Sequence, residues 1–253
     1  MGDIDLNRYR KRIARGRAVH FEGMTATRAT VFGQKVTFCT DRRNDPIQDH
    51  NRGGRFYELE ELQVILRAFP IGGVFVDIGA NIGNHTLFFA LFGHASQVIP
   101  IEPNPLAYRM LLANVVMNDL AGVVDLRHLG LGLSDGAGEG FAMQERTKNL
   151  GGAKMLEGQG DIPVRAGDEV LGDVTPAMIK IDVEGMEMRV LAGLKATIAR
   201  DKPVIFVEVD RANYDAFDLW LGAVGYKKVR EFSRYRANTN YLIVPDAAGS
   251  GAP

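Results

Sequence analysis

The chain has 253 residues, 46% of them hydrophobic, which suits one α/β domain of ordinary size with additions. Its formal net charge of −1 excludes the strong field by which charge alone attracts nucleic acid or a membrane surface. The single cysteine, Cys39, excludes an internal disulfide and fits a reducing, cytoplasmic compartment, and no apolar stretch approaches the roughly 20 residues of a transmembrane helix.

Residues 1–55 are expected to form an N-terminal extension. A basic run over residues 1–20 carries apolar residues between its arginines and predicts an amphipathic helix, which either packs on the domain with a solvated face or contacts an anionic partner. Residues 27–39 alternate and are interrupted by a Gly-Gln pair, so they predict a β-hairpin that covers the main domain.

Residues 41–55 are polar and rich in turn formers, and they predict a loop long enough to act as a lid. His50 and Arg55 on this loop are candidates to contact a substrate, and an exposed histidine without a role is an equally good interpretation. A helix is predicted to begin at Phe56, because apolar residues recur at helical spacing as far as Phe69.

The stretch 74–92 reads as a strand, a turn with two glycines and an apolar helix. This arrangement is typical of a nucleotide-type site at the carboxyl end of a parallel strand. A dinucleotide fingerprint starting at Gly79 would need glycines at the positions of Asn81 and Asn84. The turn therefore disfavours a pyrophosphate.

Acidic residues at two strand ends indicate the ligand. Asp77 would attract a cationic group, and Glu102, at the end of the next strand, could accept two hydrogen bonds from a ribose. S-adenosylmethionine combines an ammonium, a sulfonium and an adenosine and fits both acids; alternatively, both carboxylates only cap helices. The candidate cofactor residues at these turns are Asp77, Gly79, Ala80, Asn81, Gly83, Asn84, Glu102, Pro103 and Asn104.

The next segments continue the α/β pattern. A proline opens a predicted helix over residues 105–118, and residues 123–131 predict a third strand. The turn after it carries Ser134, which is a candidate for the adenine pocket or part of an ordinary turn. Residues 137–170 are irregular and predict an inserted hairpin that shapes the substrate site.

Three further carboxylates follow on two strands. Strand 177–183 ends at Asp182 and Glu184, and the following strand carries Glu208. One of these acids could act as general base toward an acceptor hydroxyl, or Asp182 and Glu184 could hold a divalent cation. The structural alternatives are an ion pair of Asp182 with Lys180 and a helix cap by Glu184. All three acids are candidate catalytic residues, Asp182 is also a candidate cofactor residue, and no residue is assigned as a resident metal ligand.

The C-terminal part predicts a helix over 213–224 and a β-hairpin from strands 226–232 and 241–244. The polar segment 233–240 between these strands could contact substrate. Residues 247–253 have the composition of a disordered tail.

Three motifs, in this order, resemble those of the FkbM-type methyltransferases. They are Asp77-Ile78-Gly79-Ala80-Asn81-Ile82-Gly83, Glu102-Pro103-Asn104-Pro105 and Lys180-Ile181-Asp182-Val183-Glu184-Gly185. The resemblance implies a class I S-adenosylmethionine-dependent methyltransferase, with a Rossmann-like doubly wound sheet of seven strands whose last strand is antiparallel. It also implies an acceptor that carries a hydroxyl oxygen on a sugar or natural product.

The resemblance adds Glu58 and Asn149, at positions that match family features, to the substrate candidates His50 and Arg55. The methyltransferase domain is expected to span residues 56–246. The expected partner is a small-molecule or carbohydrate acceptor and not a nucleic acid, and a homo-oligomer is compatible with the sequence. Two alternatives stay open: an NAD-dependent oxidoreductase and a noncatalytic protein that binds an adenosine ligand.

Overall fold

The computed structural model describes residues 15, 17, 19–21, 23–41, 43–144, 150–234 and 236–246. Most of the predicted basic helix, the substrate candidate Asn149 and the predicted tail over 247–253 lie outside these residues. Within these ranges, no helix is both long and apolar enough to cross a membrane.

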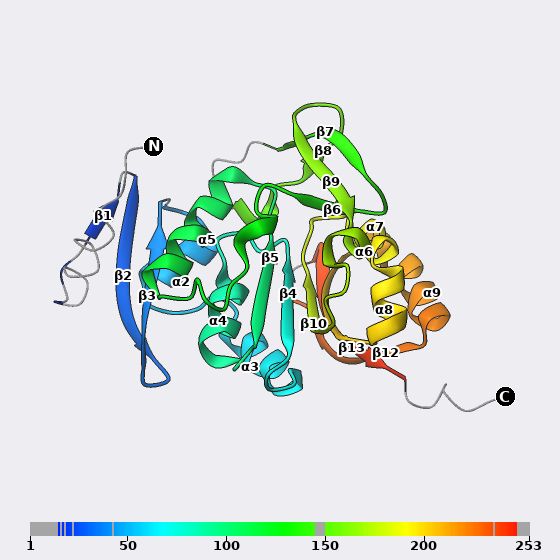
Figure 1. Ribbon diagram of the computed structural model, residues 1–253, viewed down its shortest axis with the longest axis horizontal. Helices are drawn as coiled ribbons and strands as arrows, with labels where there is room; N and C mark the ends of the chain where they lie inside the picture. The colour runs from blue at the N-terminus through cyan, green and yellow to red at the C-terminus, as the bar shows by residue number, and fades with distance from the viewer. Residues whose placement is uncertain are drawn as a thin grey trace.

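A six-stranded sheet lies at the centre of the molecule, in the order β12-β13-β11-β10-β4-β5 (Figure 1). Its strands are β4 (Val74–Ile78), β5 (Gln97–Ile101), β10 (Pro176–Ile181), β11 (Val204–Asp210), β12 (Tyr226–Phe232) and β13 (Asn238–Pro245). The pairs β4–β5, β4–β10 and β10–β11 are parallel, whereas β13 is antiparallel to both of its neighbours. This confirms the doubly wound sheet with an antiparallel last strand. Because the chain reverses its direction of progress between β4 and β10, the sheet has a topological switch point there.

Helices cover both faces of this sheet (Figure 1). They are α3 (Leu59–Ala68), α4 (Asn84–Phe92) and α5 (Pro105–Met117) on one face, and α6 (Gly167–Leu171), α7 (Glu187–Gly193), α8 (Lys195–Asp201) and α9 (Tyr214–Val224) on the other. Alternate residues of β4 enter two separate hydrophobic clusters: Phe75 packs with residues of α3 and α4, and Val76 with residues of α7 to α9. The strand is therefore buried on both faces, as its continuous apolar sequence predicts.

Two additions flank the central sheet. The predicted N-terminal hairpin is confirmed: β2 (Met24–Val31) and β3 (Gln34–Thr40) pair antiparallel, β1 (Val19–Phe21) extends them, and β3 lies against α5. The insertion predicted over 137–170 contributes β7, β8 and β9 to a second sheet in the order β6-β9-β7-β8, which projects at the top of Figure 1. Its strands are β6 (Gly132–Ser134), β7 (Gly138–Met143), β8 (Met155–Leu156) and β9 (Ile162–Ala166).

The predicted loop over 41–55 is wrong in part, because it contains the helix α2 (Pro46–Arg52). Asp45 is almost fully buried and caps this helix by accepting a hydrogen bond from the Gln48 amide at 3.1 Å. Pro46 then occupies the first helical turn, where its missing N–H costs nothing. The polar composition of this segment lacks the apolar spacing that would have predicted a helix of two turns.

The predicted strand over 123–131 is also wrong in part, because the chain runs parallel to β5 but pairs with it through isolated bridges instead of a continuous strand. Val124 and Leu129 make isolated parallel bridges to the β5 side of the sheet, and the short 3-10 helix η1 (Leu126–His128) separates them. Asp125 accepts a hydrogen bond from the Arg127 amide and turns the chain there. At the edge of the sheet beside β5, where a seventh strand was expected, the chain is thus irregular.

The chain after Glu184 forms the two short helices α7 and α8. Leu194 ends the first and precedes the second, with φ of −105° and ψ of 13°, outside regular helical values. Its apolar side chain is buried in the same core as Val190 and Ile198, so the two helices share one apolar face.

Candidate active site

Two cavities lie side by side at the carboxyl ends of β4 and β10, at the switch point of the sheet. The larger has a volume of about 290 Å³ and the smaller about 50 Å³. They share Gly79, Asn81, Asp182 and Glu184, with Gly151 from the insertion. Further residues of the larger cavity are Tyr57, Glu58, Ala80, Asn84, His85, Lys180, Phe206, Glu208, Asn238 and Asn240. Most of the predicted site residues are therefore brought together.

The turn after β4 forms the common wall of the two cavities. Gly79 has a φ of 71°, and a Cβ there would lie 1.7 Å from the carbonyl oxygen of Asp182, so the position requires glycine. Gly83, with a φ of 87°, immediately precedes α4 and approaches the side chain of Leu111 closely. This close packing directs the amino end of α4 toward the larger cavity.

Glu102 borders the smaller cavity. Its two carboxylate oxygens accept hydrogen bonds from the amides of Asn81 and Asn104, each at 2.7 Å. Burial raises the pKa of Glu102 to about 7, although the two amide hydrogen bonds favour the charged form. Each oxygen keeps a further lone pair, so the carboxylate can accept two hydroxyl groups from a bound molecule. Pro103 lies beside it in the same wall, and Asn104 caps α5.

Asp77 is completely buried and lines neither cavity. The Thr86 hydroxyl donates to its carboxylate at 2.6 Å, and the Lys180 ammonium lies 3.2 Å away. Lys180 also donates a hydrogen bond to the Gly79 carbonyl at 2.7 Å. Burial alone would lower the pKa of Lys180, but the charges of Asp77 and Asp182 outweigh it and the pKa is raised. A cationic group of a ligand in the larger cavity would therefore contact the ammonium of Lys180, which lines the cavity, and not the carboxylate of Asp77, as the sequence predicted.

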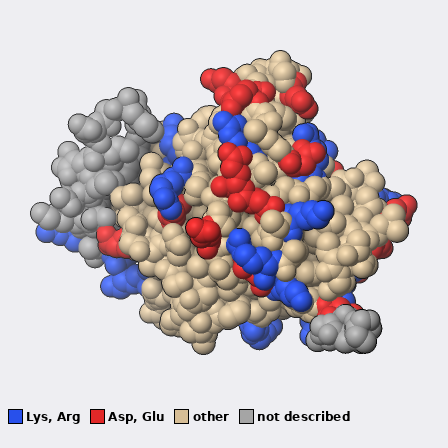
Figure 2. All heavy atoms as spheres, turned by 45° about the vertical axis from the view of Figure 1, so that its right-hand side comes forward, with Lys and Arg blue, Asp and Glu red and all other residues tan. Residues whose placement is uncertain are grey.

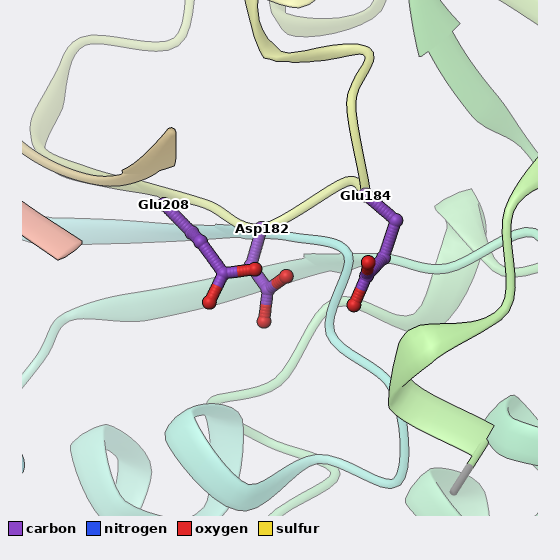
Figure 3. Close-up of side chains that lie close together, drawn as sticks. All are labelled: Asp182, Glu184 and Glu208. Carbon is purple, nitrogen blue, oxygen red and sulfur yellow. The ribbon is translucent and has the colours of Figure 1, made fainter. Parts of the chain in front are cut away.

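Asp182, Glu184 and Glu208 form an acidic cluster (Figure 3). Oxygen atoms from the three carboxyl groups lie within 4.8 Å of one another, and the Asp182 and Glu208 groups face each other. Burial and then the charges of Asp182 and Glu184 raise the pKa of Glu208 to about 10, and burial raises the pKa of Asp182 as well. A protonated Glu208 therefore donates the hydrogen bond that joins it to Asp182.

The spacing of these three carboxyl groups would also suit a divalent cation with oxygen ligands. Lys180 already places a positive charge 3.7 Å from Asp182, and the proton shared with Glu208 removes a negative one. The cluster is thus partly neutralised by the chain itself.

Glu58 and Tyr57 also line the larger cavity. The side chain of Asn84 fixes Tyr57 by accepting from its amide at 3.1 Å and donating to its carbonyl at 3.0 Å. Glu58 has left-handed backbone angles, φ 54° and ψ 41°, and its side chain does not cap α3. Burial, together with Glu61 and Asp182, raises the pKa of Glu58 to about 7.

Three of the cavity residues carry the left-handed backbone conformation that non-glycine residues rarely adopt. Glu58, Asn81 and Glu184 have φ values of 54°, 51° and 49°. Such strain costs of the order of 1–3 kcal/mol per residue and commonly gathers at binding and catalytic sites.

Some predicted site residues lie away from both cavities. His50 is exposed, with its Nδ1 2.8 Å from the Pro46 carbonyl oxygen, and Arg55 is exposed as well. Ser134 is fully buried, and its hydroxyl donates to Asp135 at 2.9 Å. None of the three lines a cavity wall.

Sequence reasoning missed His85 and Phe206 as cavity residues. His85 follows Gly83 by two residues, so its position at the start of the helix after the glycine turn was a usable signal. Phe206 carries no such signal, because it reads as one more apolar residue of a buried strand.

Acidic and basic side chains are interspersed over the face seen in Figure 2. Asp and Glu side chains run from the projecting lobe toward the middle of this face, with Lys and Arg side chains beside them. This face carries no field of a single sign.

This chain is similar to known methyltransferases. Residues 77–236 match the family model described as the methyltransferase FkbM domain. The hexuronic acid methyltransferase AglP of Haloferax volcanii is 32% identical over 194 residues, which cover 74% of this chain and 76% of that protein.

Two solved structures are among those that this chain resembles. The methyltransferase FkbM of Methylobacillus flagellatus KT has a TM-score of 0.49 at 21% identity, over 68% of this chain and 43% of that longer protein. The Pyrococcus horikoshii protein PH0793 has a TM-score of 0.51 at 15% identity, over 95% of this chain and 83% of that one.

Proposed function

This chain belongs to the FkbM methyltransferase family, and we propose that it transfers the methyl group of S-adenosylmethionine to a hydroxyl oxygen of a sugar or another small polyhydroxyl molecule. The pair of joined cavities at the switch point carries the proposal. The smaller cavity offers a carboxylate and apolar side chains to an adenosine, and the larger offers carboxylates to an acceptor.

In this proposal Glu102 accepts hydrogen bonds from the two ribose hydroxyls. The adenine ring lies against the apolar residues of the smaller cavity, which include Met143, Leu150 and Met155. Apolar walls with a few polar groups suit a heteroaromatic ring. Ser134 has no part in this arrangement, because it lies outside the cavity wall.

Asp182 is the proposed general base. S-adenosylmethionine, when bound, supplies a methyl carbon on a sulfonium that leaves as a neutral thioether, so no residue has to protonate a leaving group. The chain aligns the acceptor oxygen and removes its proton. The Asp182 side chain is 40% exposed to the cavity and accepts the hydrogen bond from Glu208, which holds its carboxylate in place.

The acceptor class rests on the larger cavity and on one relative. Its polar lining includes Glu58, Glu184, Asn238 and Asn240, whose carboxylate and amide groups suit several hydroxyls at once. The name of the relative AglP describes a methyltransferase that acts on a hexuronic acid, which is a sugar. A carbohydrate hydroxyl is therefore the proposed acceptor.

Calorimetric titration of the full chain with S-adenosylhomocysteine and, separately, with NAD tests the cofactor. Micromolar binding of the first ligand alone is the expected result, and binding of NAD alone would contradict it. Transfer of a labelled methyl group from S-adenosylmethionine to a panel of neutral sugars, uronic acids and hydroxylated natural products then tests the acceptor. Methylation of a nitrogen or carbon nucleophile, with no transfer to any hydroxyl compound, would refute the proposed chemistry.

A further inference from the structure

Arg234 joins the C-terminal hairpin to the start of α3. It lies in the connection between β12 and β13, and its Nη2 donates to both carboxylate oxygens of Glu61, at 2.8 and 2.9 Å. The two residues are 173 positions apart in the sequence. Because the Glu61 side chain is only 6% exposed, this ion pair fixes the place of the guanidinium.

The same guanidinium reaches the two cavity residues that precede α3. Its Nη1 lies 3.8 Å from Oε1 of Glu58, and its central carbon lies 5.6 Å from the centroid of the Tyr57 ring, within the range of a cation–π contact. Tyr57 and Glu58 both line the larger cavity, whereas Arg234 lines neither cavity. Arg234 therefore acts on a molecule in the cavity through the residues that it holds.

The Glu58 carboxyl receives no hydrogen bond from the described residues. It does not cap α3, and its 3.8 Å distance from Arg234 is too long for a hydrogen bond. Its side chain is nevertheless only 12% exposed. Both oxygens of Glu61, by contrast, accept from Arg234. An enclosed carboxyl group without donors is costly, and a hydroxyl group of a bound molecule would supply one.

Charged groups from several elements act on the Glu58 carboxyl. They are Glu61 on α3, Lys180 on β10, Asp182 after it, Glu208 on β11 and Arg234. Burial is the main cause that raises the pKa of Glu58 to about 7, the acids add to it, and the two cations oppose it. Since Lys180 is already paired with Asp77, Arg234 is the cation whose removal leaves the centre of the sheet intact.

We propose that Arg234 is a positioning residue, which holds Glu58 at the wall of the larger cavity so that the Glu58 carboxylate accepts a hydrogen bond from a second hydroxyl group of the acceptor. The first hydroxyl group is the one that Asp182 deprotonates and that is methylated. This inference rests on the proposed function, because it needs an acceptor with at least two hydroxyl groups. The left-handed backbone of Glu58 supports it, since such strain gathers at ligand sites.

Methyl-transfer kinetics test the role of Glu58. The probe is the sugar with the highest rate in the labelled-methyl panel, together with its monodeoxy analogues. Glu58→Met should raise KM for this sugar about 10- to 100-fold, the range for a lost hydrogen bond to a charged group, and should change kcat less than about threefold. Glu58→Gln keeps an accepting oxygen and should raise KM less than Glu58→Met.

The monodeoxy analogues identify the second hydroxyl group. One of them lacks the group that donates to Glu58, and for this analogue the parent and Glu58→Met should have KM values within about threefold of each other. For the other analogues that accept a methyl group, the two proteins should differ as they do for the sugar itself.

The role of Arg234 is tested by its dependence on Glu58. Arg234→Met should raise KM about three- to tenfold and leave kcat within about threefold. Arg234→Lys keeps the charge and should recover part of this loss. In combination with Glu58→Met, the substitution Arg234→Met should raise KM no further. The exposed Arg230 on β12 supplies the control Arg230→Met, which should leave KM within about twofold of the parent.

Carboxyl ¹³C NMR gives a readout that needs no acceptor and that a purely structural role would not move. The Glu58 signal is identified by its absence from Glu58→Gln. Its pKa should rise by about one pH unit in Arg234→Met, because a nearby positive charge is lost, and should be unchanged in Arg230→Met.

A further variant separates these effects from folding. Arg234→Met leaves the buried carboxylate of Glu61 without its cation, which destabilises the start of α3. Arg234→Met combined with Glu61→Gln removes that charge as well. If Arg234→Met alone does not fold, the combined variant takes its place in the kinetic and NMR measurements.

An unchanged KM in Glu58→Met, equal KM values for the Gln and Met variants, or a Glu58 pKa that does not respond to Arg234→Met would overturn the inference. Methyl transfer by the parent to a hydroxyl group would still stand in each of these cases. If the parent methylated no hydroxyl compound of the panel, the proposed function would fail and the inference with it. That outcome is distinct, because it is seen before any substitution is made.

Discussion

The ammonium of Lys180 lies 3.2 Å from the carboxylate of Asp77, and neither side chain is more than 4% exposed. The two residues face each other across the parallel pair β4–β10, and the same ammonium donates to the Gly79 carbonyl. The ion pair thus connects the two strands at the switch point with the glycine turn that separates the cavities.

Removal of Lys180 should therefore destabilise the whole fold. Lys180→Met leaves the Asp77 charge buried without a cation, and we expect a loss of about 3–5 kcal/mol in the free energy of unfolding, measured in urea at pH 7.5. Thr86→Val is the control, because it removes one hydrogen bond to the same carboxylate and should cost about 1–2 kcal/mol. Equal effects of the two substitutions would show that the Lys180 charge does not stabilise the buried Asp77.

The position of Asp77 illustrates what the sequence can predict. A strand followed by Asp and a glycine turn predicted the switch point and the cofactor side of the sheet, because strand, turn and helix signals are local. The same local pattern could not reveal that Lys180, 103 residues later, forms an ion pair with the Asp77 carboxylate. A partner on a neighbouring strand depends on the order of the strands in the sheet.

Other errors have similar physical causes. Helix α2 was missed because its sequence is polar and its stability depends on the buried side chain of Asp45, which caps its first turn. The strand predicted over 123–131 is interrupted, because a local turn at Asp125 leaves only isolated parallel bridges on either side of it. The joined cavities bring together residues from both ends of the chain, and their walls depend on tertiary packing that no local pattern encodes.

Glu102 should make stability fall as the pH rises. The pKa of its carboxyl is about 7 in the folded chain against an ordinary value of 4.5. Between these values the unfolded chain loses the proton first, so the folded state loses relative stability as the pH rises from 4.5 to 7. Glu102→Gln removes this dependence, and its stability relative to the parent should improve by about 3 kcal/mol between pH 4.5 and pH 8.

Urea unfolding across this pH range gives the measurement, and S-adenosylhomocysteine binding gives the functional counterpart. The same variant should lose about 100-fold in affinity, because the amide replaces one carboxylate oxygen that accepts from the ribose. A difference in stability that stayed constant with pH would contradict the raised pKa. Unchanged affinity would contradict the ribose contact.

Replacement of Asp182 and of Glu208 by the corresponding amides should affect methyl transfer differently. Glu208 already holds a proton near pH 8, and Glu208→Gln keeps a donor toward Asp182, so methyl transfer should fall less than tenfold. Asp182→Asn removes the proposed base and should lower kcat about 100- to 10,000-fold.

Both variants should bind S-adenosylhomocysteine within about fivefold of the parent, which separates chemistry from cofactor binding. Initial rates at saturating acceptor, measured from pH 6 to pH 9, give the comparison. A larger loss of kcat for Glu208→Gln than for Asp182→Asn would contradict Asp182 as the general base and would assign that role to Glu208.

Asp45 should hold the insertion against the larger cavity. One oxygen of its buried carboxylate caps α2, and the other accepts a hydrogen bond from the amide of Leu150 at 2.9 Å. Ile47 and Gly151, next to these two contacts, both line the cavity. Asp45→Ala should cost about 2 kcal/mol of stability through the lost cap and the unpaired Leu150 amide, and should speed hydrogen exchange at that amide.

The matched substitution is Asp49→Ala, in the same helix at a half-exposed position that pairs with Arg52. It should change stability by less than about 0.5 kcal/mol and leave the Leu150 amide protected. Because the cavity wall would loosen with Asp45→Ala, KM for the acceptor should rise more than kcat falls. Faster exchange confined to α2, with Leu150 unaffected, would show that the carboxylate caps the helix without restraining the insertion.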